Sequence, residues 1–307
     1  MKYFKNQKCD FIYPVITMGT FDGVHLGHQK LLQELKSKAR EHGGEAVVIT
    51  YYHHPLETIH KSTFPYLLTE KEKKEELLKM YGVDCVLYLD FSENMVNISA
   101  EDFLCNIIIG EVKAKAIVIG YDTHFGKNRS GDFQFLKENS RNYNYEIDII
   151  EPYKIDNRII SSSLIRDLVR EGDMQYVSEL LGRNYSASGV VKTGHRIGHG
   201  LGFPTINLHP ADNHKLVPGI GVYICEVEFL GSRYKAVTNV GYSPTLKNTG
   251  IKEIETHILD FKGDLYNTPV EIFFHKKLRN ELHFENKDKL IGMIEKDIKL
   301  TKEYFGE

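Results

Sequence analysis

The chain of 307 residues is long enough for two domains, each with its own hydrophobic core. Its net charge of −3 gives no electrostatic reason to expect a nucleic-acid partner. No segment approaches the ~18 apolar residues of a membrane helix, no apolar signal-peptide core opens the chain, and the four cysteines form no CxxC pair. These absences predict reduced thiols, no zinc site, no membrane association and a cytoplasmic location.

Strand and helix patterns alternate through the first ~185 residues. Apolar runs predict strands at 14–21, 45–52, 83–89, 115–121 and 145–151. Helical periodicity predicts helices at 27–41, 69–81, 99–109 and 132–140, followed by a helical region at 162–181 that breaks near Gly172. This α/β alternation predicts a doubly wound parallel sheet that binds ligands at the carboxyl ends of its strands.

The pattern changes after Gly182-Arg183. Short β-rich runs at 188–191, 221–229, 234–240, 253–261 and 270–274 are separated by Gly, Pro and Asn turns. They predict a small antiparallel barrel or sandwich, and we favour the barrel. Residues 286–305 have the apolar spacing of a terminal amphipathic helix. We therefore predict two domains, an N-terminal α/β domain at 1–183 and a C-terminal β-barrel domain at 184–307.

The decapeptide GTFDGVHLGH occupies residues 19–28, between the first predicted strand and the first predicted helix. In a strand–turn–helix of this kind, backbone N–H groups and a helix N-terminus face an anion. His25 and His28 add ring donors at the same place. Two surface histidines on a tight turn are the alternative, but the HxGH spacing in this context favours a phosphate-handling site.

Three further polar segments fall at predicted strand ends or loops. They are residues 50–55 with His53-His54, residues 120–131 with Asp122, and residues 160–166, which read ISSSLIR. A serine cluster at a helix start is usually an N-cap. Here it also gathers hydroxyls, N–H groups and Arg166, which suits a triphosphate.

In this order the four segments resemble the adenylyltransferase half of the bacterial bifunctional riboflavin kinase/FMN adenylyltransferase family, also called FAD synthetase. Its motifs are GxFDGxHxGH, a TFDPHP-like loop, a GxDFxFGxxxxG-like loop and ISSTxIR. The resemblance implies transfer of AMP from ATP to the phosphate of FMN, with release of pyrophosphate.

The same resemblance implies roles for single residues. His25 and His28 are expected to stabilise charge on the ATP phosphates, and His54 and Asp122 to border the flavin or the nucleotide. The β and γ phosphates are expected to lie against Ser162, Ser163 and Arg166. The remaining nucleotide-binding positions of the first motif are Gly19, Phe21, Asp22 and Gly27.

A second glycine-rich segment spans residues 194–207 and contains no Walker A motif. Gly194, Gly198 and Gly200 allow the backbone to approach a ligand closely, although a turn of a small barrel needs glycines too. Thr205 and Asn207 alternate, so their side chains share one side of a strand. Their oxygens could hold Mg²⁺, which takes few protein ligands besides phosphate and water.

This segment resembles the riboflavin kinase domain, whose signature is a glycine loop followed by GFPTxN. The resemblance implies that Thr205 and Asn207 bind Mg²⁺–ATP. Glu255 is then expected to be the general base that deprotonates the ribityl 5′-hydroxyl for attack on the γ-phosphate. Arg279 is expected to contact flavin or nucleotide. Riboflavin, FMN, FAD and ATP are substrates or products, so no tightly bound redox cofactor is expected.

Three alternatives stay open. Departures from the family motifs at Tyr52-His53 and His199 leave room for an enzyme with only one working half-reaction. A flavin-binding regulator without turnover is disfavoured because binding alone does not need Glu255. A nucleotidyltransferase for another substrate leaves the FPTxN segment without a role.

Overall fold

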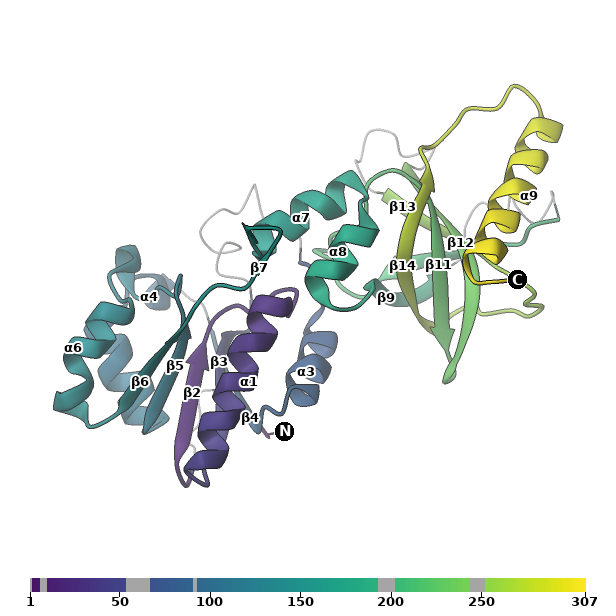
Figure 1. Ribbon diagram of the computed structural model, residues 1–307. Helices are drawn as coiled ribbons and strands as arrows, with labels where there is room; N and C mark the ends of the chain where they lie inside the picture. Colours follow the sequence, from purple (N-terminus) through teal and green to yellow (C-terminus); the bar gives the residue numbers. More distant parts are fainter. Residues whose placement is uncertain (1, 6–9, 54–66, 91–92, 193–201, 243–251) are drawn as a thin grey trace. The chain divides into compact units, whose positions relative to one another are not determined.

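The computed structural model describes residues 2–5, 10–53, 67–90, 93–192, 202–242 and 252–307. The chain forms two compact units, residues 1–65 with 71–161 and residues 66–70 with 162–307 (Figure 1). The short segment 66–70 therefore belongs with the C-terminal unit, although the chain on both sides of it belongs to the first. The predicted boundary near residue 183 is a different kind of division, because it separates the residues needed for one activity from those needed for the other. It stays a prediction.

The first unit is built on a six-stranded parallel sheet. In spatial order its strands are β1 (Lys2–Lys5), β4 (Cys85–Leu89), β3 (Glu45–Tyr51), β2 (Pro14–Met18), β5 (Ala116–Gly120) and β6 (Glu146–Ile150). The direction of winding reverses between β2 and β5, and in such sheets ligands bind at the carboxyl ends of the strands at this switch point. The predicted doubly wound sheet is confirmed.

Helices cover both faces of this sheet (Figure 1). On one face, α1 (Leu26–Glu41) and α3 (Lys71–Met80) pack on the buried side chains of alternate strand residues. On the other, the π-helical segment η1 (Phe103–Glu111) and α6 (Phe133–Tyr143) do the same. The split follows from the two-residue period of a strand, which sends Val15 to one face and Ile16 to the other.

Short elements complete the first unit. They are α4 (Glu93–Val96), α5 (Ala100–Asp102) directly before η1, a 3₁₀ turn η2 (Lys127–Arg129), and the hairpin of β7 (Lys154–Ile155) and β8 (Arg158–Ile159).

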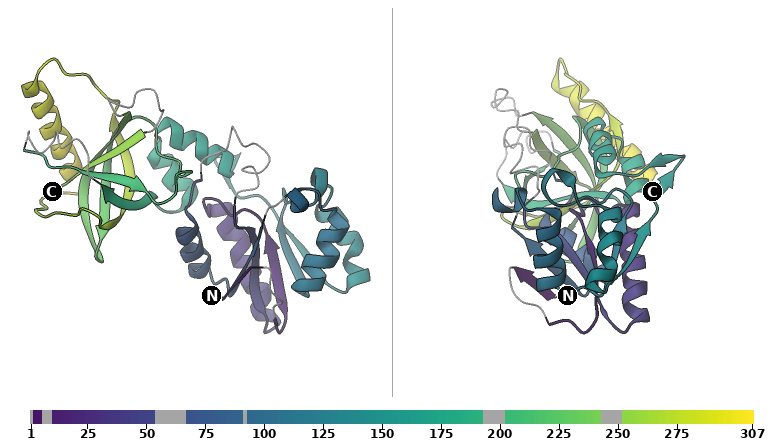
Figure 2. Two further views of the ribbon diagram at one scale, coloured as in Figure 1. Left: turned by 180° about the vertical axis from the view of Figure 1, so that it is seen from behind. Right: turned by 90° about the vertical axis from the view of Figure 1, so that its left-hand side faces the viewer.

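The second unit begins with α7 (Ser162–Glu171) and α8 (Met174–Leu181), which are separated at Gly172 as predicted. Six antiparallel strands then close into a barrel. Around the barrel they are β10 (Ile206–Pro210), β13 (Lys252–Ile258), β12 (Ser232–Tyr242), β11 (Gly221–Phe229), β14 (Pro269–Arg279) and β9 (Tyr185–Lys192). The terminal helix α9 (Lys287–Tyr304) packs along β12 (Figure 2). The predicted barrel with its terminal helix is confirmed.

Burial alternates along the barrel strands and defines their two faces. On β13, Ile254, Thr256 and Ile258 are buried, whereas Glu253, Glu255 and His257 are partly exposed. The buried hydroxyls of Thr256 and Thr238, which are paired on the neighbouring strands β13 and β12, satisfy each other, with 3.0 Å between their Oγ1 atoms. Glu255 therefore belongs to the outer face of the barrel.

A buried ion pair attaches segment 66–70 to the barrel. The ammonium of Lys215 lies 2.9 Å from Oε2 of Glu70 and donates to the carbonyl of Leu68 at 2.8 Å. The other carboxylate oxygen of Glu70 accepts from the backbone N–H of Ser188 at 2.9 Å. The two charged side chains are only 1% and 4% exposed, so each depends on the other for compensation of its charge.

Candidate functional site

The HxGH turn lies between β2 and α1, at the carboxyl edge of the first sheet. His25 is the N-cap residue of α1, and its Nδ1 accepts a hydrogen bond from the backbone N–H of His28 at 3.3 Å. A neutral His25 ring then carries its proton on Nε2 and can donate from that atom. The His25 and His28 rings are stacked, with centroids 3.7 Å apart and planes inclined by 13°. A ring donor and a helix N-terminus thus occur together, as the sequence predicts for an anion site.

The other predicted positions of this turn support the two histidines. A Cβ atom at Gly27 would lie 3.1 Å from Cε1 of His25, so any other residue would push that ring out of place by a few tenths of an ångström. Gly19 donates its N–H to the carbonyl of Ile49 and ties the turn to β3. Phe21 is buried with its ring 5.1 Å from that of His28, and Asp22 is 3% exposed.

The backbone of the turn is strained. Phe21, Gly23 and Val24 all have positive φ, of 51°, 90° and 39°. For a β-branched residue such as Val24 this is an outlier, and such conformations cost about 1–3 kcal/mol each. Gln29 holds the strained turn by donating from Nε2 to the carbonyl of Val24 at 2.9 Å. Strain retained at a ligand-facing turn is typical of a functional site.

Two lysines of α3 border the same sheet edge, and the sequence analysis missed both. Lys74 Nζ donates to the carbonyl of Thr20 at 3.4 Å, and Lys71 Nζ lies 4.3 Å from the centroid of the Tyr52 ring. Burial lowers the pKa of Lys74, while the charge of Asp22 opposes the change. The turn therefore has cationic as well as ring donors close to it.

The structure describes most, but not all, of the other predicted N-terminal site residues. Asp122 follows β5, the neighbour of β2, so it lies at the switch point of the sheet together with the HxGH turn. His54 lies outside the described residues. Ser162, Ser163 and Arg166 form the first turns of α7, which belongs to the second unit. Their contact with the triphosphate stays a prediction.

The barrel brings three predicted residues into one row across its strands. Asn207 of β10 is directly opposite Glu255 of β13, and Glu255 is directly opposite Asn239 of β12. The row continues through Val222 of β11 to Arg279 of β14. Directly opposed residues of antiparallel strands face the same side of the sheet. Residues more than 70 positions apart in the sequence thus share the outer face of the barrel.

Thr205 lies beside the same row. Its neighbour Pro204 is held against β13, since its carbonyl oxygen lies 2.9 Å from Nδ1 of His257, and the Phe203 ring packs edge-on against the His257 ring. Gly194, Gly198 and Gly200, together with His199, lie outside the described residues. Their predicted contact with nucleotide is therefore untested.

Arg279 has a clear structural partner. Its guanidinium makes a forked contact with Asp297 of α9, from Nε to Oδ1 at 3.2 Å and from Nη2 to Oδ2 at 2.8 Å. Asp297 is 3% exposed and was not predicted from the sequence. The pair ties the terminal helix to the end of the row. The predicted contact of Arg279 with flavin or nucleotide is not tested.

The donor set suits a hard cation that is brought in with a nucleotide. The hydroxyl of Thr205 and the amide oxygen of Asn207 are oxygen ligands, which Mg²⁺ prefers, and phosphates and water complete its shell. Within the described ranges, no group of three or more His, Cys, Asp and Glu side chains could hold a metal by itself. In the same part of the chain, no helix is both long and apolar enough to cross a bilayer.

Comparisons with known proteins divide the chain into two successive family regions. The FAD synthetase family model matches residues 10–164, and the riboflavin kinase family model matches residues 181–305. A bifunctional riboflavin kinase/FMN adenylyltransferase of Buchnera aphidicola (subsp. Schizaphis graminum) is 36% identical over 95% of this chain and 94% of that protein. The Escherichia coli K12 protein of the same name is 33% identical over 95% and 93%.

A solved structure has the same fold along the whole chain. It is named as a macrolide-efflux protein from Streptococcus pneumoniae, with a TM-score of 0.89 and 28% identity over 98% of this chain and 99% of that chain. The activity in that name differs from the one on which the family models and the curated relatives agree.

Proposed function

The chain belongs to the bifunctional riboflavin kinase/FMN adenylyltransferase family and acts in flavin cofactor biosynthesis, and from this premise we propose which residues carry its two reactions. The HxGH turn of the first unit serves adenylyl transfer. The outer-face row of the barrel serves phosphorylation of riboflavin. Both reactions use ATP with Mg²⁺, and we place the enzyme in the cytoplasm.

In adenylyl transfer, a phosphate oxygen of FMN attacks the α-phosphorus of ATP. A new P–O bond forms there while the bond to the β-phosphate breaks, and pyrophosphate leaves. No covalent nucleophile is needed, so the protein contributes positioning and stabilisation of charge. His25 and His28 donate to the phosphates from the N-terminus of α1. Asp122 borders the nucleotide or the flavin from the neighbouring strand, and Ser162, Ser163 and Arg166 hold the leaving pyrophosphate.

In phosphorylation, the carboxylate of Glu255 takes the proton of the ribityl 5′-hydroxyl as its oxygen attacks the γ-phosphorus, and ADP leaves. Thr205 and Asn207 hold Mg²⁺ and the nucleotide beside Glu255. The cation neutralises charge on the phosphates when it is bound. The observation that supports this assignment best is the register that sets Asn207 opposite Glu255 on the outer face of the barrel.

Two variants of the full chain, one at each proposed site, test whether the two activities depend on separate residues. We expect Glu255→Gln to remove FMN formation from riboflavin and ATP but to leave FAD formation from FMN largely intact. We expect His28→Ala to lower FAD formation on the order of a hundredfold, as loss of a charge-stabilising donor does, and to spare the kinase. Chromatography of the flavins measures both steps in one incubation.

In each variant, the activity of the site that was not altered shows that the protein is folded. Loss of both activities in a folded Glu255→Gln protein would contradict independent sites. An unchanged FAD rate in His28→Ala would remove that histidine from the mechanism. If the unaltered protein yields only one product, one half-reaction is silent, and if it binds flavin without product, the regulator alternative holds.

A further inference from the structure

Asn239 stands out in the outer-face row because no role has been assigned to it and because its Oδ1 atom lacks a hydrogen-bond partner among the described residues. This Oδ1 atom is also buried. A buried acceptor without a donor costs about 1–3 kcal/mol. Such an atom in a native fold requires an explanation, and a ligand that supplies the donor is one.

The position of Asn239 points to the reacting end of the kinase site. It is directly opposite Glu255, so the two side chains share the outer face with β-carbons about 4.5–5.5 Å apart. Asn207 flanks Glu255 from the opposite strand. The expected general base therefore lies between two amides. Asn207 is already expected to hold Mg²⁺–ATP on one side of Glu255. Asn239 is on the other side, where the ribityl chain that receives the phosphoryl group must lie.

A glycine, Gly241, lies two residues after Asn239 on the same face of β12. A Cβ atom on Gly241 would lie 3.4 Å from Nδ2 of Asn239 and 2.6 Å from Oε1 of Glu281. Because φ at Gly241 is not positive, glycine is not needed there for the backbone conformation. The missing side chain instead lets the carboxylate of Glu281 lie close to the backbone beside the amide.

The unsatisfied atom is an acceptor, and this selects its ligand. Phosphate oxygens are acceptors too and would repel Oδ1, so ATP phosphates are excluded as partners. A polyol chain offers several O–H donors, and one of its hydroxyls must already lie at Glu255 for phosphorylation. A neighbouring hydroxyl of the same chain can then reach a residue directly across from Glu255.

We propose that Asn239 is a substrate-positioning residue of the kinase site, whose Oδ1 accepts a hydrogen bond from a ribityl hydroxyl next to the one that Glu255 deprotonates. The inference rests on the proposed function of the row and extends it to a residue that recognises the polyol part of the flavin. The isoalloxazine ring plays no part in this contact.

Binding of two flavins to the full chain tests the contact without turnover. Riboflavin carries the ribityl chain, whereas lumiflavin has the same ring system with a methyl group instead. In fluorescence titrations, we expect Asn239→Ala to weaken riboflavin about tenfold, the worth of one hydrogen bond, and to leave lumiflavin unchanged. Equal changes for both flavins, or no change for either, overturn the proposal. So does a loss of Mg²⁺–ATP binding with riboflavin binding unchanged, which would make Oδ1 a metal ligand.

A second variant, of nearly the same side-chain shape, tests whether residue 239 lies beside the general base Glu255. Asn239→Asp keeps an acceptor of the same size but sets a negative charge opposite Glu255, which raises the pKa of that carboxyl. We expect the acid limb of the pH profile for FMN formation to move to higher pH. An unmoved profile contradicts the placement of Asn239 beside the base.

Asn184→Ala is the matched control. Its amide also belongs to the second unit, where Oδ1 accepts from Ser178 at 3.2 Å and Nδ2 lies 3.1 Å from Nε2 of His275. We expect a lower melting temperature but an unchanged ratio of riboflavin to lumiflavin affinity. A changed ratio would mean that the ratio reports only stability and would overturn the reading of Asn239→Ala. If the unaltered chain binds riboflavin but forms no FMN, the proposed function fails while the binding comparison still decides the contact; if it binds no riboflavin, both fail.

Discussion

Gly27 lies in the first turn of α1, against the ring of His25. Any side chain there would meet Cε1 and Nδ1 of that ring at 3.1 and 3.2 Å, which is closer than ordinary packing. The ring would have to shift by a few tenths of an ångström, and its stacking on His28 and the cap of α1 would shift with it. The position of the stacked His25 and His28 rings therefore depends on the absence of a side chain at Gly27.

We predict that Gly27→Ala separates activity from stability. Alanine is a better helix former than glycine by about 1 kcal/mol, so the melting temperature should not fall. FAD formation from FMN should fall about tenfold or more, because small misplacements of catalytic groups are costly. FMN formation in the same samples is the control. Full FAD activity in the variant would show that the position of the His25 ring is not critical.

The residues that carry a motif could be predicted, whereas their unmarked neighbours could not. Glu255 and Asn207 were predicted from the family motifs, and the register of β10 and β13 sets them opposite each other. Asn239 lies in a segment that also resembles the riboflavin kinase domain, but the sequence assigns it no role, and only the fold places it opposite Glu255. Asp297 is one acidic residue in a helix rich in charge, and only the fold shows that it is buried against Arg279.

At the scale of elements, the apolar periodicity predicts every strand of the first sheet except β1. Its sequence KYFK has no apolar run and is recognisable only by its pairing with β4 at the sheet edge. The helix predicted at 99–109 is helical but continues as the wider π-helix η1, a difference that periodicity does not detect. β10 is not among the predicted β-rich runs because it is short and ends in Pro210, although the alternation of Thr205 and Asn207 placed these two residues on a strand.

The buried pair of Glu70 and Lys215 should be the most sensitive polar contact of the second unit. We predict that Glu70→Gln lowers the free energy of unfolding by about 3–5 kcal/mol, because it leaves the charge of Lys215 buried without a counter-charge. Urea titration followed by circular dichroism measures the loss. Combining it with Lys215→Met should restore much of the stability. A single variant as stable as the unaltered chain would contradict the compensation of charge inferred here.

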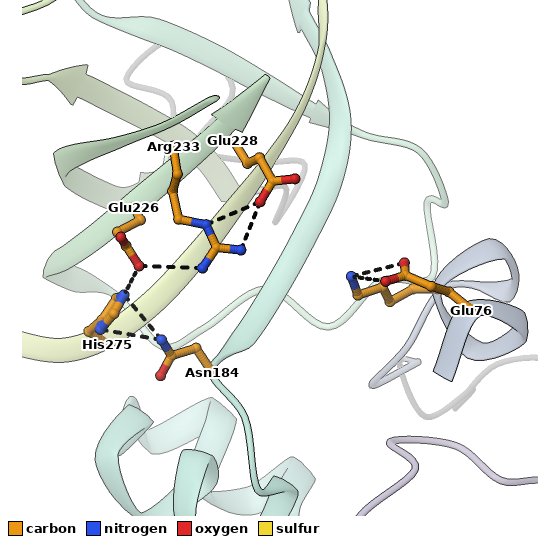
Figure 3. Close-up of polar contacts among 7 residues, drawn as sticks. Glu76, Asn184, Glu226, Glu228, Arg233 and His275 are labelled. Atoms are coloured by element: carbon orange, nitrogen blue, oxygen red, sulfur yellow. Dashed lines mark hydrogen bonds and ion pairs between the residues drawn. The ribbon is translucent and has the colours of Figure 1, made fainter. Parts of the chain in front are cut away.

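A second polar cluster on the barrel predicts a dependence on pH (Figure 3). Nε2 of His275 lies 2.8 Å from Oε2 of Glu226, which Arg233 also approaches at 3.7 Å. Burial lowers the pKa of His275 more than the Glu226 carboxylate raises it, and Arg233 adds to the lowering. The unfolded chain, with a histidine pKa of about 6.5, therefore binds the proton more readily than the folded one.

From this sign we predict that the free energy of unfolding falls as the pH drops below about 6.5, until the lowered pKa of the folded state is reached. His275→Gln removes this titration, so its stability should fall less steeply over the same interval. Thermal melts of both proteins between neutral and mildly acidic pH make the comparison. Parallel curves would show that His275 has the same proton affinity in both states.

At the scale of the whole molecule, the helices α7 and α8 decide where the kinase unit can be cut. α8 buries Met174, Val177, Leu180 and Leu181 and contacts β9 and β14. Each such side chain contributes about 1.5–3 kcal/mol, and together they compare with the total stability of a domain, about 5–15 kcal/mol.

We therefore predict that a fragment of residues 162–307 with Lys215→Met, a change that removes the buried charge left unpaired without Glu70, keeps a cooperative thermal transition and forms FMN. A fragment of residues 184–307 with the same change melts at least 10 °C lower or does not fold, since a loss of 1 kcal/mol lowers the melting temperature by about 4–8 °C in domains of this size. Circular dichroism melts and kinase assays compare the two. Equal stability would show that the predicted boundary near residue 183 is also a boundary of folding.

Segment 66–70 bears on how such a protein can be recombined. Since the chain enters the second unit for these five residues and then returns to the first, the two halves are not consecutive cassettes. A chimera that joins this N-terminal half to a barrel from a distant relative contains Glu70, but the new barrel need not have a lysine at the position of Lys215 to pair with it. Exchange by a single crossover therefore favours parents that share this pair, so the two halves are expected to have been inherited together.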